Sequence, residues 1–91
     1  MKIYEVKNEY QADFKAHKVN AEFQSDLKVY IVNNEYQATK EFLWYFVPNE
    51  YQADKKVYFV PNEYQADINV YFVNNEYQAG WRNSSKKSVL L

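Results

Sequence analysis

Hydrophobic and polar positions alternate along short segments of this chain. In residues 68–73, the side chains of Ile68, Val70 and Phe72 share one face of an extended segment, and the intervening residues share the other. β-Branched and aromatic residues in this alternation predict a β-strand. Because both faces carry apolar residues, we expect one face to be buried and the other to be at least partly covered.

A polar cluster follows each predicted strand, and it marks an internal repeat. The triplet Glu-Tyr-Gln recurs along the chain, with Glu-Phe-Gln in one copy. The central aromatic residues lie 13 residues apart, except for one interval of 15. They are Tyr10, Phe23, Tyr36, Tyr51, Tyr64 and Tyr77. The chain therefore contains six 13-residue units, with a two-residue insertion around Thr39 to Leu43.

Three positions of the unit are identical in all six copies. Two are the glutamate and the glutamine of the triplet, and the third is a valine at the end of the predicted strand. The valines are Val6, Val19, Val32, Val47, Val60 and Val73. Because every copy within one chain keeps these residues, we infer that each unit needs them for its own structure. We predict that the valines form the structural core of the repeat.

The connector Asn62-Glu63-Tyr64-Gln65 predicts a single helical turn. A two-residue hairpin would favour Asn-Gly or Asp-Gly, and the chain has neither. Asparagine is a good N-cap, glutamine three residues later completes a capping box, and glutamate suits the first turn of a helix. A calcium loop would need several converging oxygens and usually a glycine. We therefore assign the conserved triplet to capping and expect no metal site.

Two arrangements of these units fit an all-β fold. The favoured one is an antiparallel meander, which can close into a small barrel; the alternative is a short-coil β-solenoid. Parallel neighbours usually need a crossover of about a dozen residues, and only about six or seven are present between the predicted strands. A solenoid would also stack the glutamates about 4.8 Å apart, where like charges repel. In its favour, it would stack tyrosine on tyrosine and glutamine on glutamine.

The pattern also predicts how the domain is closed and where it ends. An open sheet would expose two edges and an apolar face, so we expect either a barrel or a homodimer. Residues 1–83 form the predicted single domain, and residues 84–91 form a polar C-terminal tail. Gly80 and Trp81 break the repeat, and Trp81 is expected to plug the last open end of the core. The Ser/Lys segment should be solvated, with residues 89–91 either docking back or fraying.

The repeat also resembles that of a known group of proteins. The pattern Gln-Ala-Asp-x-Lys-Val-Tyr-x-Val is similar to that of small bacterial proteins of unknown function with tandem Tyr-Lys-Ser-Gln-Ala-Asp segments. In those proteins, an insertion between the third and fourth repeats precedes a tryptophan, and a Gly-Trp pair lies near the end. Trp44 and Gly80-Trp81 match these two features. The chain departs from them in having Asn-Glu-Tyr where they have Tyr-Lys-Ser. The resemblance implies no activity.

Composition and charge exclude several classes of function. The chain has no cysteine and one histidine, His17, so we expect no disulfide, no cofactor and no catalytic apparatus. The net charge is −1, which gives no electrostatic attraction for nucleic acid or an anionic membrane. No apolar run is long enough to span a membrane. The N-terminal residues lack the apolar stretch of a signal peptide, and the cytoplasm is the predicted location.

Aromatic residues make up 20% of the chain, and a row of tyrosines at equivalent strand positions is the main candidate site. Lysine precedes three tyrosines of this row by two residues, hence on the same face. The candidate binding residues are Tyr30, Tyr45, Tyr58 and Tyr71, together with Trp44 after the insertion. Structural packing is the simplest explanation of this row, and a protein interface is the next. Trp44 is also explained simply as a core anchor.

These observations favour a non-enzymatic structural or protein-interaction domain. Such a domain would form a homo-oligomer, for example a dimer, or bind a protein partner. The alternative is a ligand-binding module that uses the face of tyrosines and lysines for single-stranded nucleic acid or glycan, because aromatic rings interleaved with cations stack bases and follow a phosphate backbone. Nucleic acid is the less expected partner, since the chain carries almost no net charge.

Overall fold

A computed structural model describes all of residues 1–91, and strands alternate with single 3-10 turns along the chain. The strands are β1 (Lys2–Glu5), β2 (Phe14–Lys18), β3 (Leu27–Ile31), β4 (Leu43–Phe46), β5 (Lys55–Phe59), β6 (Ile68–Phe72) and β7 (Gly80–Trp81). The turns are η1 (Glu9–Gln11), η2 (Glu22–Gln24), η3 (Glu35–Gln37), η4 (Glu50–Gln52), η5 (Glu63–Gln65) and η6 (Glu76–Gln78), and η7 (Ser84–Leu90) follows β7. The predicted unit of one strand and one helical turn is thus confirmed.

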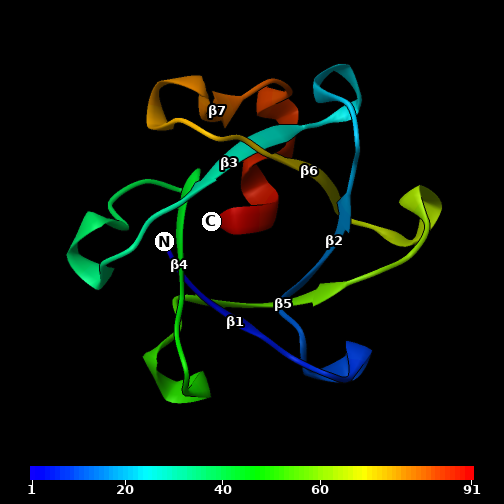
Figure 1. Cartoon of the computed structure of the whole chain (residues 1–91). Coiled ribbons are helices and arrows are strands. Elements are labelled where there is room, and N and C mark those ends of the chain that lie inside the picture. The colour runs from blue at the N-terminus through cyan, green and yellow to red at the C-terminus, as the bar shows by residue number, and fades with distance from the viewer.

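The six main strands close into a barrel, seen end-on in Figure 1. Their order around the ring is β4-β1-β5-β2-β6-β3, and β3 pairs with β4 to complete it. The short strand β7 pairs with the beginning of β3, on the edge that β3 shares with β4. When β7 is counted as a seventh position between β3 and β4, every connection along the chain passes one strand, and the chain runs twice around the ring before it ends.

All pairings among the six main strands are parallel, so the predicted antiparallel meander is wrong. A solenoid is wrong as well, because consecutive strands never lie side by side in the first circuit: β5 separates β1 from β2, and β6 separates β2 from β3. Of the two predicted ways of covering the sheet, a barrel or a homodimer, the structure has the closed barrel.

The register of the strands explains how a short connector joins parallel strands. Lys18, at the end of β2, and Leu27, at the start of β3, both pair with Val70 of β6, from opposite sides. Two strand spacings amount to about 10 Å, so residues 19–26 need only cross one strand. A crossover of about a dozen residues is not needed here. That length is required only when the chain must return along the full length of a strand before it begins the next parallel one.

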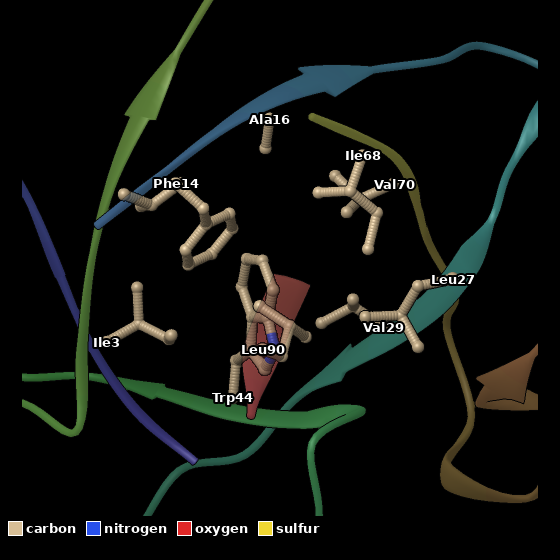
Figure 2. Packing of buried hydrophobic residues seen from close by; sticks show 10 residues of the cluster. Ile3, Phe14, Ala16, Leu27, Val29, Trp44, Ile68, Val70 and Leu90 are labelled. Carbon is tan, nitrogen blue, oxygen red and sulfur yellow. The ribbon is translucent and has the colours of Figure 1, made fainter. Parts of the chain in front are cut away.

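The barrel interior is filled by two layers of side chains. The residue three positions before each conserved valine is fully buried, and these residues form the central layer: Ile3, Ala16, Val29, Trp44, Val57 and Val70. Phe14, Leu27 and Ile68 lie on the same faces of their strands and join this cluster. Figure 2 shows the indole of Trp44 reaching across the centre of the barrel, beside Phe14. One large side chain thereby fills the space that the small Ala16 leaves.

The conserved valines do not belong to this central cluster. An odd spacing of three residues places them on the outer face of their strands, opposite the central layer. Five of the six are buried there, and Val73 is only half-buried. Their backbone amides also join neighbouring strands: the amide of Val6, for example, donates to the Val57 carbonyl at 2.9 Å. The prediction that they are buried thus holds for five copies, but on the outer side of the barrel.

The two ends of the chain close one mouth of the barrel. Residues 84–91 were expected to be a polar tail, with residues 89–91 either docking back or fraying. Ser84–Leu90 form the 3-10 helix η7, and docking is the alternative that the structure has, because Leu90 is a member of the central cluster. Met1 and Trp81 pack against the same cluster, in line with the plug expected of Trp81. Burial lowers the pKa of the Met1 ammonium from its usual value of 8.0. The core therefore extends beyond the six repeats into the C-terminal segment.

Candidate functional site

The tyrosine row predicted as a binding surface lies on the outer side of the barrel and is half-buried. Its members are Tyr4, Tyr30, Tyr45, Tyr58 and Tyr71. The three lysines that precede them are in ion pairs: Lys28 with Glu22 at 3.2 Å, and Lys2 and Lys56 with Glu35 and Glu50 at 3.5 Å. Carboxylates of the conserved triplets thus already pair with the cations that a nucleic-acid backbone would contact.

Trp44 is fully buried and has no surface to offer a ligand in this structure. Its ring packs edge-to-face against Phe14, Phe46 and Phe72, with centroids 5.9–6.1 Å apart. The indole N–H donates to the Glu41 carbonyl at 2.7 Å. Glu41 lies in the two-residue insertion, so the insertion supplies the polar partner that a buried indole requires.

The most exposed aromatic residues are instead those at the tips of the 3-10 turns. Tyr10, Tyr51, Tyr64 and Tyr77 are each 85% exposed, and Phe23 is 74% exposed. Tyr36 occupies the same position and is also exposed. Sequence reasoning missed these six rings as a surface because it assigned the whole triplet to capping. One feature of the sequence could have indicated this surface. All six copies have an aromatic residue between the glutamate and the glutamine, and capping explains only those two neighbours.

Each tip is held by a small set of local bonds. In the copy at η4, the amide of Gln52 donates to the Asn49 carbonyl at 3.1 Å, and the Asn49 side-chain amide donates to Gln52 Oε1 at 3.4 Å. In η3 and η6, the glutamine oxygen also accepts from the backbone amide of the asparagine, as in a capping box. The predicted capping box is therefore present in η3 and η6. In η1, η4 and η5 the asparagine side chain only donates to glutamine, and η2 has alanine at the N-cap.

The six turns stand out around the rim of a flat molecule. The principal extents are 33 × 30 × 21 Å, and Figure 1 shows the turns projecting outward at the corners of the ring. The exposed rings therefore point away from the barrel in different directions. No single turn brings two of them together, since each unit contributes one tip.

The open mouth of the barrel holds the largest cavity of the molecule, about 520 Å³ in volume. Three phenylalanines, Phe46, Phe59 and Phe72, line it together with Glu5 and Lys18. His17 also lines it, and its Nδ1 lies 3.1 Å from the Val60 carbonyl, so this nitrogen carries the proton in the neutral ring. No group of three or more histidine, cysteine, aspartate or glutamate side chains is placed to hold a metal ion.

Comparison with known families assigns the fold. The family model of the 7(1) septoil knot domain matches residues 1–82. The chain belongs to this family. The strand order has a matching sevenfold path, because with β7 included the chain advances two places at a time around seven positions. No curated protein and no solved structure matches the chain.

The septoil knot family bears on the resemblance found in the sequence. It is a small, repeat-like domain family that covers nearly all six units, as the resemblance implied. A bacterial origin stays a prediction. No helix of this septoil knot domain combines the length and the apolar character needed to cross a membrane.

Proposed function

We propose that this septoil knot domain is a non-enzymatic protein-interaction module that binds its partner through the aromatic tips of its 3-10 turns. The observation that carries the proposal is the exposure of these rings, which reaches 85% in four of the six copies. An aromatic side chain gains nothing from the fold when it is this exposed, because hydrophobic stabilisation scales with the area removed from water. Because an exposed aromatic ring recurs in all six turns, we infer that these rings bind another molecule.

The chemistry of the tips suits a protein partner. Tyrosine offers a large, rigid and amphipathic contact area at a low cost in side-chain entropy, and it is enriched at binding hot spots. Phe23 keeps the ring and lacks the hydroxyl, so the property shared by all six tips is the aromatic ring. In each turn, the backbone amide of the glutamine donates to the carbonyl of the residue before the glutamate. This bond holds the backbone of the turn in place before binding, which lowers the entropy lost on association.

Other candidate functions have less support. The alternative of nucleic acid or glycan along the outer tyrosines faces half-buried rings and lysines already in ion pairs. A homodimer was expected in order to cover an open sheet, and the closed ring leaves no such sheet to cover. Self-association of the closed barrel would therefore have to use the tips as well.

A tip-dependent binding experiment tests the proposal. The first variant replaces the six tip aromatics, Tyr10, Phe23, Tyr36, Tyr51, Tyr64 and Tyr77, with serine. A matched control replaces the half-buried Tyr4, Tyr30, Tyr45, Tyr58 and Tyr71 with phenylalanine, which keeps their packing. Circular dichroism and thermal unfolding establish that both variants remain folded.

Proteins recovered by proximity labelling in the producing cells are then purified and titrated against the three forms. Light scattering of each form tests the case in which the partner is a second copy. The proposal predicts that a partner binds the wild type and the control with similar affinity and binds the tip variant at least about tenfold more weakly, since truncating a hot-spot residue costs about 2 kcal/mol or more. Equal binding by the tip variant would contradict it.

A further inference from the structure

The open mouth of the barrel is a second surface, independent of the tips. The residue before each conserved valine points inward and stands at this mouth, opposite the mouth that η7 closes. In ring order these residues are Phe46, Glu5, Phe59, Lys18, Phe72 and Ile31. Three aromatic rings thus alternate with one anion, one cation and one aliphatic side chain.

The apolar part of this mouth forms a cup of suitable size for a small molecule. The whole pocket at this mouth, which also includes His17, Val60 and Pro61, has a volume of about 520 Å³. That volume lies within the range of about 300–1,000 Å³ that is typical of ligand pockets. Phe46 and Phe72 are held edge-to-face against the buried indole of Trp44, with centroids 6.1 and 5.9 Å from it. The rings of the cup therefore rest on a fixed aromatic base.

The charges at the rim differ from the lysines on the outer face of the strands, all four of which are in ion pairs. Lys2, Lys15, Lys28 and Lys56 each pair with a glutamate of a conserved triplet. Glu5 and Lys18 form no ion pair, either with each other or with another residue. They stand on β1 and β2, on either side of β5, which carries Phe59. The Lys18 ammonium lies 5.5 Å from the centre of the Phe72 ring, so it is held over the cup.

We propose that this cup binds a small aromatic zwitterion of the aromatic amino-acid class. The aromatic ring of the ligand would lie among Phe46, Phe59 and Phe72, its carboxylate would pair with Lys18, and its ammonium would pair with Glu5. Only a ligand that carries both charges next to an aromatic body matches both unpaired groups. Because the mouth is open to water, the charged ends stay near the surface and the ring enters the cup.

A second copy of the chain is the main competing occupant. Its exposed tyrosine tips would supply an aromatic ring, and in four of the tips the neighbouring glutamate is already paired with a lysine. At Tyr64 and Tyr77 the neighbouring glutamate is outside any ion pair and could meet Lys18, but no cationic residue belongs to the Glu-Tyr-Gln triplet. Such an occupant would leave Glu5 unsatisfied, so charge complementarity favours the zwitterion.

The test compares three probes by backbone amide NMR of the full chain. Phenylalanine carries both charges, 3-phenylpropionate lacks the ammonium, and phenethylamine lacks the carboxylate. We expect phenylalanine to give saturable shifts at Glu5, Lys18, Phe59 and their neighbours, and to bind about tenfold or more tightly than either singly charged probe, because each charge-assisted contact is lost separately.

Two variants assign the charged contacts. Lys18→Met should weaken phenylalanine about tenfold and leave phenethylamine unchanged, whereas Glu5→Gln should weaken phenylalanine and leave 3-phenylpropionate unchanged. Lys28→Met and Glu22→Gln, which remove an ion pair on the outer face, are matched controls and should leave all three affinities unchanged. All four side chains are polar surface groups, and thermal unfolding verifies the fold of each variant.

Three results would overturn the proposal. One is the absence of saturable shifts up to about 10 mM phenylalanine, a concentration that reveals even millimolar affinity. Another is equal affinity for the three probes. The last is movement of the cup signals with protein concentration alone, which would make a second copy the occupant. The first two results do not depend on the tips, so a failure of this proposal on either of them is separate from a failure of the proposed function.

Discussion

Asp13 and Lys56, which are 43 residues apart in the chain, exchange two hydrogen bonds. The Lys56 amide donates to Asp13 Oδ2 at 2.8 Å, and the Asp13 amide donates to the Lys56 carbonyl at 2.8 Å. The same exchange joins Asp26 to Asn69, Asp54 to Lys2 and Asp67 to Lys15. The aspartate that ends each Gln-Ala-Asp sequence thus ties the first circuit of the chain to the second.

This bond predicts a measurable loss of stability. Asp13→Ala should lower the free energy of unfolding by about 1–2 kcal/mol, because it removes a charged acceptor from a backbone amide. Lys56→Met is the control, since it keeps the Lys56 backbone amide and removes only an exposed ion pair with Glu50, worth about 0–1 kcal/mol. Urea denaturation compares the two. A smaller loss for Asp13→Ala than for Lys56→Met would contradict this role.

Trp44 should be the most costly core residue to truncate. Trp44→Ala is expected to cost about 3–5 kcal/mol, because it leaves a large cavity where the indole is fully buried. Trp44→Phe should cost less, since it keeps a ring in place but leaves the Glu41 carbonyl without its indole donor. Thermal and chemical unfolding measure both. A loss below about 1 kcal/mol for Trp44→Ala would mean that the indole does not fill the barrel.

The conserved valines predict a contrast between two copies. Val60→Asp should unfold the protein, because Val60 is only 7% exposed and an unpaired buried carboxylate is strongly destabilising. Val73→Asp is the matched change at a half-buried position, and we expect that variant to remain folded with reduced stability. Circular dichroism at increasing temperature distinguishes the two. Equal behaviour of the two variants would contradict the burial described here.

The capping glutamines should also differ between copies. Gln37 Oε1 accepts from the Asn34 backbone amide at 3.2 Å, and Gln37→Ala should cost about 1 kcal/mol. Gln65 Oε1 has a 3.3 Å contact with the Asn62 side chain, which is exposed to water, and Gln65→Ala should cost less than half as much. Equal costs in urea denaturation would show that the backbone bond does not determine the difference.

Much of the local structure could be predicted from the sequence, because it depends on residues that are neighbours in the chain. The strand over residues 68–72 and the turn at Glu63–Gln65 follow from alternation and capping. The direction of the strands could not be predicted in the same way. It depends on which strand pairs with which, and Lys18 meets Val70 rather than a residue of the adjacent unit. The aspartates carry this information, but a side chain that bonds a distant backbone amide leaves no local pattern.

The candidate surfaces show a similar limit. The six tip aromatics are visible in the sequence, and their exposure became clear only with the turn in place. The cup had a weaker signal: the position before the conserved valine holds phenylalanine in three copies and a charged residue in two. That signal could not be used while the inward face of the strand was unknown. Tyr30 and its equivalents attracted attention instead because they repeat more regularly.

Both surfaces depend on the interleaved ring, and one measurement tests the ring directly. Long-range HNCO spectroscopy detects coupling across individual backbone hydrogen bonds in solution. The structure predicts couplings from the amides of Val6, Val19 and Val60 to the carbonyls of Val57, Val70 and Ala16, respectively. Couplings that instead join each of these valines to the next unit along the chain would contradict the interleaved ring, and with it the placement of the tips and the cup.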